Sequence, residues 1–155
     1  MPNLPPMSES APAIPRRTWG AIAMAAFRIL LAVLLVIAGA NHLRVPDFYL
    51  TMMPPYLPVP GLLILISGLA EMAGGVLLLI PQTRRLAAYG LIALLVAVFP
   101  ANLHLVFHHD QPPWNTVPVW VLWLRLPLQL PMIAWVYVVA LRRRAAPVHD
   151  AGPAS

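Results

Sequence analysis

Residues Gly61–Ile80 read GLLILISGLAEMAGGVLLLI, an apolar run whose one ionisable side chain is Glu71. A helix of about 20 apolar residues crosses the roughly 30 Å hydrocarbon core of a bilayer. Pro60 and Pro81 flank the run, and proline limits a helix at either end. This segment therefore predicts a membrane-spanning helix that carries a single acid.

Three further runs have the same character, and we expect spans at about 19–41, 61–80, 86–107 and 118–141. The chain has 155 residues, of which 60% are hydrophobic and only 10% are charged. So few charges cannot cover the surface of a soluble domain of this size. The sequence predicts an all-α fold, an integral membrane four-helix bundle over 18–143, with disordered tails at 1–17 and 144–155.

Two proline-rich stretches interrupt this pattern. The segment Arg44–Pro60 contains five prolines, which exclude a long helix, and its aromatic residues suit a short element at the membrane interface. Pro127 and Pro131 lie inside the fourth run, where we expect a kink in a continuous helix. The alternative is a separate interfacial piece at Trp120–Arg125, with the span beginning near Leu126.

The arginines predict the orientation. Seven of them flank the spans on one side, in the groups Arg16–Arg17, Arg84–Arg85 and Arg142–Arg144, whereas the loops of the other side hold only Arg44. Positive residues stay on the cytoplasmic side, so we expect a plasma-membrane protein with both termini in the cytoplasm. No basic face interleaved with aromatic residues is present, and we therefore expect no nucleic-acid partner.

Polar residues inside the spans are the candidate site, because ionisable groups at membrane depth are costly and usually face a protein interior. Counting along the helices places several of them near the membrane midplane or in the outer half, where they could share one pocket. The candidates are Arg28, Glu71, Asn102, His104, Arg125 and Gln129.

The chemistry of these side chains suggests how they pair. A lone carboxylate in hydrocarbon would take up a proton, whereas arginine keeps its charge, so Glu71 should pair with Arg28 or Arg125. Two arginines against one glutamate would leave a net positive pocket, suited to a quinone carbonyl or a small anion. The alternative is a structural polar lock that fixes the register of the helices.

Histidines and cysteines contribute little to the prediction. His104 and His108 share a helix face, and with His42 they could hold a metal, but no carboxylate cluster supports them. We therefore expect hydrogen-bonded histidines and no metal. The chain has no cysteine, which excludes disulfide and thiolate chemistry. No catalytic residue can be assigned.

The chain resembles the DoxX/DoxD-like group of small four-span membrane proteins, which includes the small subunit of thiosulfate:quinone oxidoreductase and the methylamine-utilisation protein MauE. The resemblance runs from about Arg28 to Tyr137. It rests on the order and spacing of short motifs: FRILLA…AGANH at 27–42, MMPPYLPVPG at 52–61, ISGLAEMAGG at 66–75, PQTRRLAAYGLI at 81–92, VFPANLH at 98–104 and LRLPLQ at 124–129.

The resemblance implies a four-helix membrane bundle, linked in a few members to sulfur or quinone redox chemistry. Related four-helix proteins of the vitamin K epoxide reductase type depend on cysteines, which this chain lacks. We expect an accessory subunit that binds a redox partner protein and a quinone, without a cofactor that can be assigned with certainty. The alternatives are a quinone-linked oxidoreductase subunit, with Glu71 or His104 as proton carrier, and a small anion or weak-acid transporter. The oligomeric state is left open.

Overall fold

The computed structural model describes residues 19–141, and it is helical throughout with no strand in that range. Four helices are long and apolar enough to cross a membrane: α1 (Trp19–Arg44), α3 (Pro60–Leu79), α4 (Arg84–Phe107) and α5 (Val119–Ala140). Two short elements join them, α2 (Pro46–Leu50) and the 3-10 helix η1 (Trp114–Thr116). An all-helical fold with four candidate spans is thus confirmed. The predicted tails, 1–17 and 144–155, lie outside the described residues.

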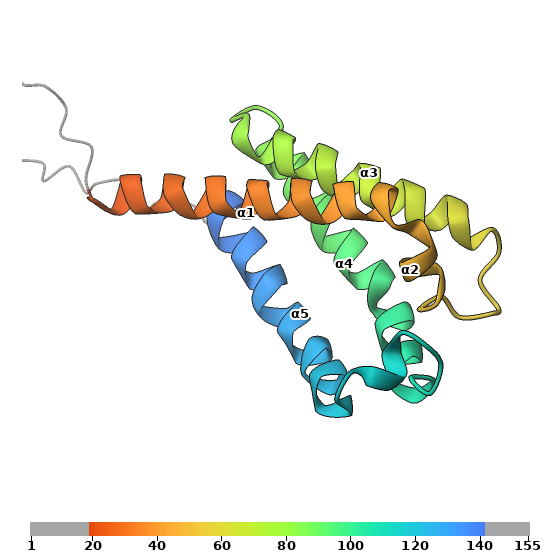
Figure 1. The fold of residues 1–155 in the computed structure, drawn as a ribbon. Helices are drawn as coiled ribbons and strands as arrows, with labels where there is room; N and C mark the ends of the chain where they lie inside the picture. The colour runs from red at the N-terminus through yellow and green to blue at the C-terminus, as the bar shows by residue number, and fades with distance from the viewer. Residues whose placement is uncertain (1–18, 142–155) are drawn as a thin grey trace, which may run out of the picture.

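The four long helices are arranged as a close pair and a more open pair. Figure 1 shows α1 and α3 lying side by side, while α4 and α5 slant away from them and meet at the loop that contains η1. The turn from α3 to α4 and the end of α5 lie toward one end of the bundle, and the first turns of α1 project beyond them (Figure 1). The segment from α1 to α3 and the η1 loop lie at the other end.

Glycine explains why α1 and α3 pack so closely. A Cβ atom added to Gly39 would lie 2.4 Å from the carbonyl oxygen of Gly68, and one added to Gly75 would lie 2.8 Å from that of Ala32. Small residues at such positions let two membrane helices approach backbone to backbone. The two helices are therefore held in one register and one rotation about their axes.

The core is divided into two clusters. The first lies toward the α3–α4 turn and consists of Leu31, Leu35, Leu78, Ala87, Ala88, Leu91, Val136 and Val139. The second lies at the opposite end and consists of Met52, Leu105, Val106, Trp114 and Leu122. Most other large apolar side chains of the long helices are exposed, as expected for surfaces that face lipid.

The segment between α1 and α3 is part of the bundle rather than a peripheral loop. Its prolines restrict helix to the five residues of α2, and Met52, 4% exposed, then inserts into the second core cluster. The indole Nε1 of Trp114 donates a hydrogen bond to Thr51 Oγ1 at 2.8 Å, which ties this segment to the η1 loop. The two connections therefore close this end of the bundle together.

Helix α5 is continuous through Pro127 and Pro131. The expectation of one unbroken helix is met, and a separate piece at Trp120–Arg125 is not formed. The largest difference from the predicted spans is at the end of α1, which continues to Arg44 instead of ending near Asn41. That extra turn carries His42 into the bundle.

Candidate functional site

Four polar side chains from four different helices meet at the end of the bundle that holds α2. They are His42 of α1, Tyr49 of α2, Glu71 of α3 and Arg125 of α5, and we call them the polar cluster. His42 Nδ1 lies 3.5 Å from Glu71 Oε2. The rings of His42 and Tyr49 are 3.9 Å apart between centroids. Arg125 lies close enough to the other three residues to interact electrostatically with each of them.

Two glycines, each one helical turn before a member of the cluster, place His42 and Glu71. Gly39 and His42 are one turn apart on α1, and Gly68 and Glu71 are one turn apart on α3, so each pair shares a helix face. A Cβ atom on Gly68 would lie 2.7 Å from the Cβ of His42. Because Gly68 has no such atom, the imidazole packs directly against α3 and reaches the carboxyl group of Glu71.

Two residues of the polar cluster are largely buried, and a third is exposed. The side chains of His42 and Glu71 are 14% and 16% exposed. Their facing atoms, Nδ1 and Oε2, are buried and make no hydrogen bond within residues 19–141. Arg125, in contrast, is exposed, and its Nη1 approaches the sulfur of Met52 at 3.8 Å. An acid and a base therefore face each other beside a guanidinium that something outside the chain can reach.

Tyr49 adds a phenol to the cluster. Burial raises the pKa of Tyr49, and the negative charge of Glu71 raises it further, whereas Arg125 and a hydrogen bond with the Asn41 side chain lower it. The net direction is upward, because burial is the largest of these effects. The phenol therefore stays protonated near neutral pH, where it can donate a hydrogen bond.

Of the six residues predicted as a site, Glu71 and Arg125 are brought together and Arg28 is not. The guanidinium of Arg28 donates from Nε and Nη2 to the Val139 carbonyl oxygen, at 3.0 and 2.9 Å, in the last turn of α5. Carbonyls in a final turn have no partner within their own helix, so this bond satisfies one of them. Along α1, Arg28 and His42 are about 21 Å apart at 1.5 Å per residue.

This separation excludes one of the two partners predicted for Glu71 and corrects the prediction of a shared pocket. Arg28 does not pair with Glu71, and the pocket with two arginines against one glutamate is wrong. The imidazole of His42 lies 3.5 Å from Glu71, and Arg125 interacts with Glu71 electrostatically. Counting residues gave the approximate depth of each side chain but not the face of the helix on which it lies.

Two amides of the predicted set are buried between the helices. Gln129, 8% exposed, donates from Nε2 to the Leu95 carbonyl oxygen and so joins α5 to α4. That carbonyl is next to the one of Val96, which loses its helical donor because Pro100 has no N–H. Asn102 is 9% exposed on α4. Gln129 thus connects helices instead of extending the polar cluster.

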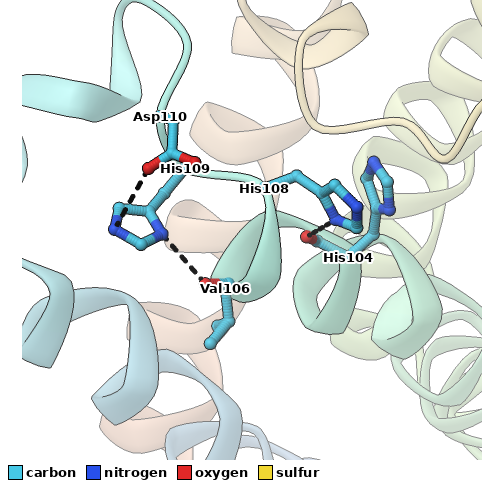
Figure 2. A network of polar contacts seen from close by, with 5 residues as sticks. All are labelled: His104, Val106, His108, His109 and Asp110. Carbon is cyan, nitrogen blue, oxygen red and sulfur yellow. Dashed lines mark hydrogen bonds and ion pairs between the residues drawn. The ribbon is translucent and has the colours of Figure 1, made fainter.

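His104 lies at the end of α4 with a partner of its own. Its ring stacks on that of His108, with centroids 4.0 Å apart, and His108 Nδ1 is 3.0 Å from the His104 carbonyl oxygen (Figure 2). Figure 2 shows His109 and Asp110 turned to the other side of the helix end. Within residues 19–141, no group of three or more His, Cys, Asp or Glu side chains could hold a metal.

Sequence reasoning missed two members of the cluster. It considered His42 only as a conceivable metal ligand and treated Tyr49 as one of several interfacial aromatic residues. The signal that could have found His42 is the pair of glycines, each one turn before a polar residue on neighbouring spans. For Tyr49 no comparable signal exists, because its position depends on how α2 folds back over the end of α1.

Comparisons with known proteins identify a family. No curated protein and no solved structure matches the chain. A match to a family does extend from Leu31 in α1 to Ala140 at the end of α5, which includes all of the polar cluster and excludes Arg28. Residues 31–140 match the family described as "Domain of unknown function (DUF8561)", and the chain belongs to this family.

Proposed function

We propose that this protein is a DoxX-like accessory subunit of the plasma membrane, with both termini in the cytoplasm, which binds a quinone headgroup at the polar cluster and presents it to a redox partner protein. The observation that carries the proposal is the cluster itself. It places a guanidinium, a phenol, an imidazole and a carboxyl group together beside a lipid-facing surface.

These groups suit a quinone chemically. The two carbonyl oxygens of a quinone are electron-rich and accept hydrogen bonds, and Arg125 and Tyr49 are donors for them. Reduction of a quinone also takes up protons, for which a carboxyl group and an imidazole are the usual carriers in proteins. His42 Nδ1 and Glu71 Oε2 face each other and make no other hydrogen bond within the described residues, so a proton can be held between them.

The electrons must come from elsewhere, which is why we propose an accessory role. The chain has no cysteine, so dithiol–quinone exchange is excluded. The described helices carry little mass outside the candidate spans, apart from α2, η1 and short turns. A partner protein with its own redox centre would supply electrons, and the exposed side of Arg125 is the approach to the bound headgroup.

The test is a measurement of quinone that copurifies with the protein. Protein would be extracted with a styrene–maleic acid polymer, which retains native lipid, and the organic extract would be assayed for quinone. We expect near-stoichiometric quinone in the wild type and at least about tenfold less in Arg125→Leu, since a hydrogen bond to a charged donor contributes about 1.5–3 kcal/mol.

Arg44→Leu is the matched control, because Arg44 is an exposed arginine of α1 near the same end of the bundle and outside the cluster. Its quinone content should equal that of the wild type. Tyr49→Phe, which removes only a hydroxyl group, should give an intermediate loss. Absence of quinone from the wild type would make the cluster a structural lock, and full retention in Arg125→Leu would place any quinone elsewhere.

A further inference from the structure

A second candidate site lies at the opposite end of the bundle, between α4 and α5. A groove of about 580 Å³ is lined there by Arg85, Tyr89 and Ile92 of α4, by Tyr137 of α5 and by Leu141, which directly follows α5. This volume is in the range of sites that take small molecules. The polar cluster contributes nothing to it, so the groove is independent of the function proposed above.

The polarity of the groove lining changes from the end of the bundle inward. Arg85, Tyr89 and Ile92 are spaced along one face of α4, and on the facing side Tyr137 lies in the last turn of α5, whose C-cap is Leu141. Arg85 is in the first turn of α4, at the end of the bundle, whereas Ile92 lies two turns deeper and packs on the first core cluster. The groove therefore has a cation beside an apolar side chain at its mouth, two tyrosines below them and an apolar residue at its inner end.

The charge at this end is uncompensated within the described residues. The acids of residues 19–141 are Asp47, Glu71 and Asp110; Asp47 and Asp110 lie in the connections of the other end, and Glu71 lies about halfway along α3, facing His42. Arg84 is engaged, because its Nε donates to the Leu78 carbonyl oxygen at 3.1 Å. Arg85 makes no hydrogen bond or ion pair within residues 19–141 and is exposed.

A single molecule matches a cationic mouth above an apolar floor at the end of a membrane helix. We infer that the groove binds an anionic phospholipid of the leaflet on the Arg84–Arg85 side, with its phosphate on Arg85 and the tyrosine hydroxyls and an acyl chain along Ile92. Basic pockets between membrane helices take anionic headgroups in this way. Tyr89 and Tyr137, 63% and 54% exposed, have the amphipathic side chains that occupy the headgroup level.

The experiment compares lipids that differ only in headgroup. The full chain in detergent would be titrated with phosphatidylglycerol or with phosphatidylcholine of the same acyl chains, and the thermal unfolding midpoint would be followed, since a ligand that binds the folded state raises it. We expect a saturable rise with phosphatidylglycerol that phosphatidylcholine does not give. Arg85→Gln should weaken the apparent affinity for phosphatidylglycerol about tenfold, as expected for the loss of one charge-assisted hydrogen bond.

Arg44→Gln controls for general charge, because it removes an exposed arginine at the other end of the bundle, and it should respond like the wild type. The midpoint of Arg85→Gln in phosphatidylcholine checks its folding, and Arg85→Lys, which keeps the charge, should retain part of the response. An equal rise with both lipids, an equal loss in Arg44→Gln, or the same rise with inorganic phosphate would each overturn the inference.

Discussion

Gly68 shows how one missing side chain can assemble a polar site. A Cβ atom added to Gly68 would lie only 2.7 Å from the Cβ of His42, so the glycine leaves room for the histidine. The imidazole then faces Glu71 across the α1–α3 interface. In a membrane, a carboxyl group among apolar helices is costly unless a polar group faces it. The glycine therefore determines which group Glu71 faces, although it makes no polar contact itself.

Tyr49 provides a pH-dependent prediction at the scale of single residues. Burial and the charge of Glu71 both disfavour the tyrosinate anion, so the pKa of Tyr49 should lie above its ordinary value of 10.0. The measurement is an alkaline titration of tyrosinate absorbance, with the Tyr49→Phe curve subtracted from that of the wild type. The difference should titrate with a midpoint above 10.0.

The same titration separates the two causes. In Glu71→Gln the negative charge is absent but the burial remains, so the midpoint for Tyr49 should fall only part of the way back toward 10.0. A midpoint at or below 10.0 in the wild type would mean that the phenol is solvated and lies outside the polar cluster.

At the scale of elements, the close α1–α3 pairing should be sensitive to a single methyl group. In Gly39→Ala, the new Cβ would lie 2.4 Å from the Gly68 carbonyl oxygen and 3.0 Å from the Met72 backbone nitrogen, neither of which can move alone. Overpacking of this kind costs about 1–3 kcal/mol, so the thermal unfolding midpoint in detergent should fall by several degrees.

Gly20→Ala is the control in the same helix. Nothing lies within 4 Å of a Cβ added at Gly20, so the methyl group meets no resistance, and alanine is the better helix former by up to about 1 kcal/mol. Its midpoint should be unchanged or slightly higher. Equal effects of the two substitutions would show that α1 and α3 do not touch through Gly39.

The helices themselves were predictable, whereas their contacts were not. Apolar length and flanking prolines locate the four long helices, and proline density restricts α2 to a few residues. The partners of Arg28 and Glu71 depend on the rotation and vertical offset of α1 against α3. Those follow from glycine-mediated packing over the whole interface, which residue counting cannot supply. Glu71 and Arg125 were both predicted, but the histidine between α1 and α3 was not.

At the scale of the whole molecule, the ends of the bundle differ in charge. Arg84 and Arg85 lie at the end with the α3–α4 turn, while the carboxylates of Asp47 and Asp110 lie in the connections of the other end. A protein inserted according to its arginines would keep the α3–α4 turn in the cytoplasm. The polar cluster would then open toward the outer leaflet and the lipid groove toward the inner one.

This orientation can be tested with single cysteines, because the chain contains none of its own. Gln111 and Gln82 are exposed residues in the connections at opposite ends of the bundle. In intact cells, a membrane-impermeant thiol reagent should label Gln111→Cys and leave Gln82→Cys unlabelled, and lysis should make both reactive. Labelling of Gln82→Cys alone would show that the protein has the opposite orientation and that the arginines do not determine it. Both proposed ligand sites would then lie in the other leaflet.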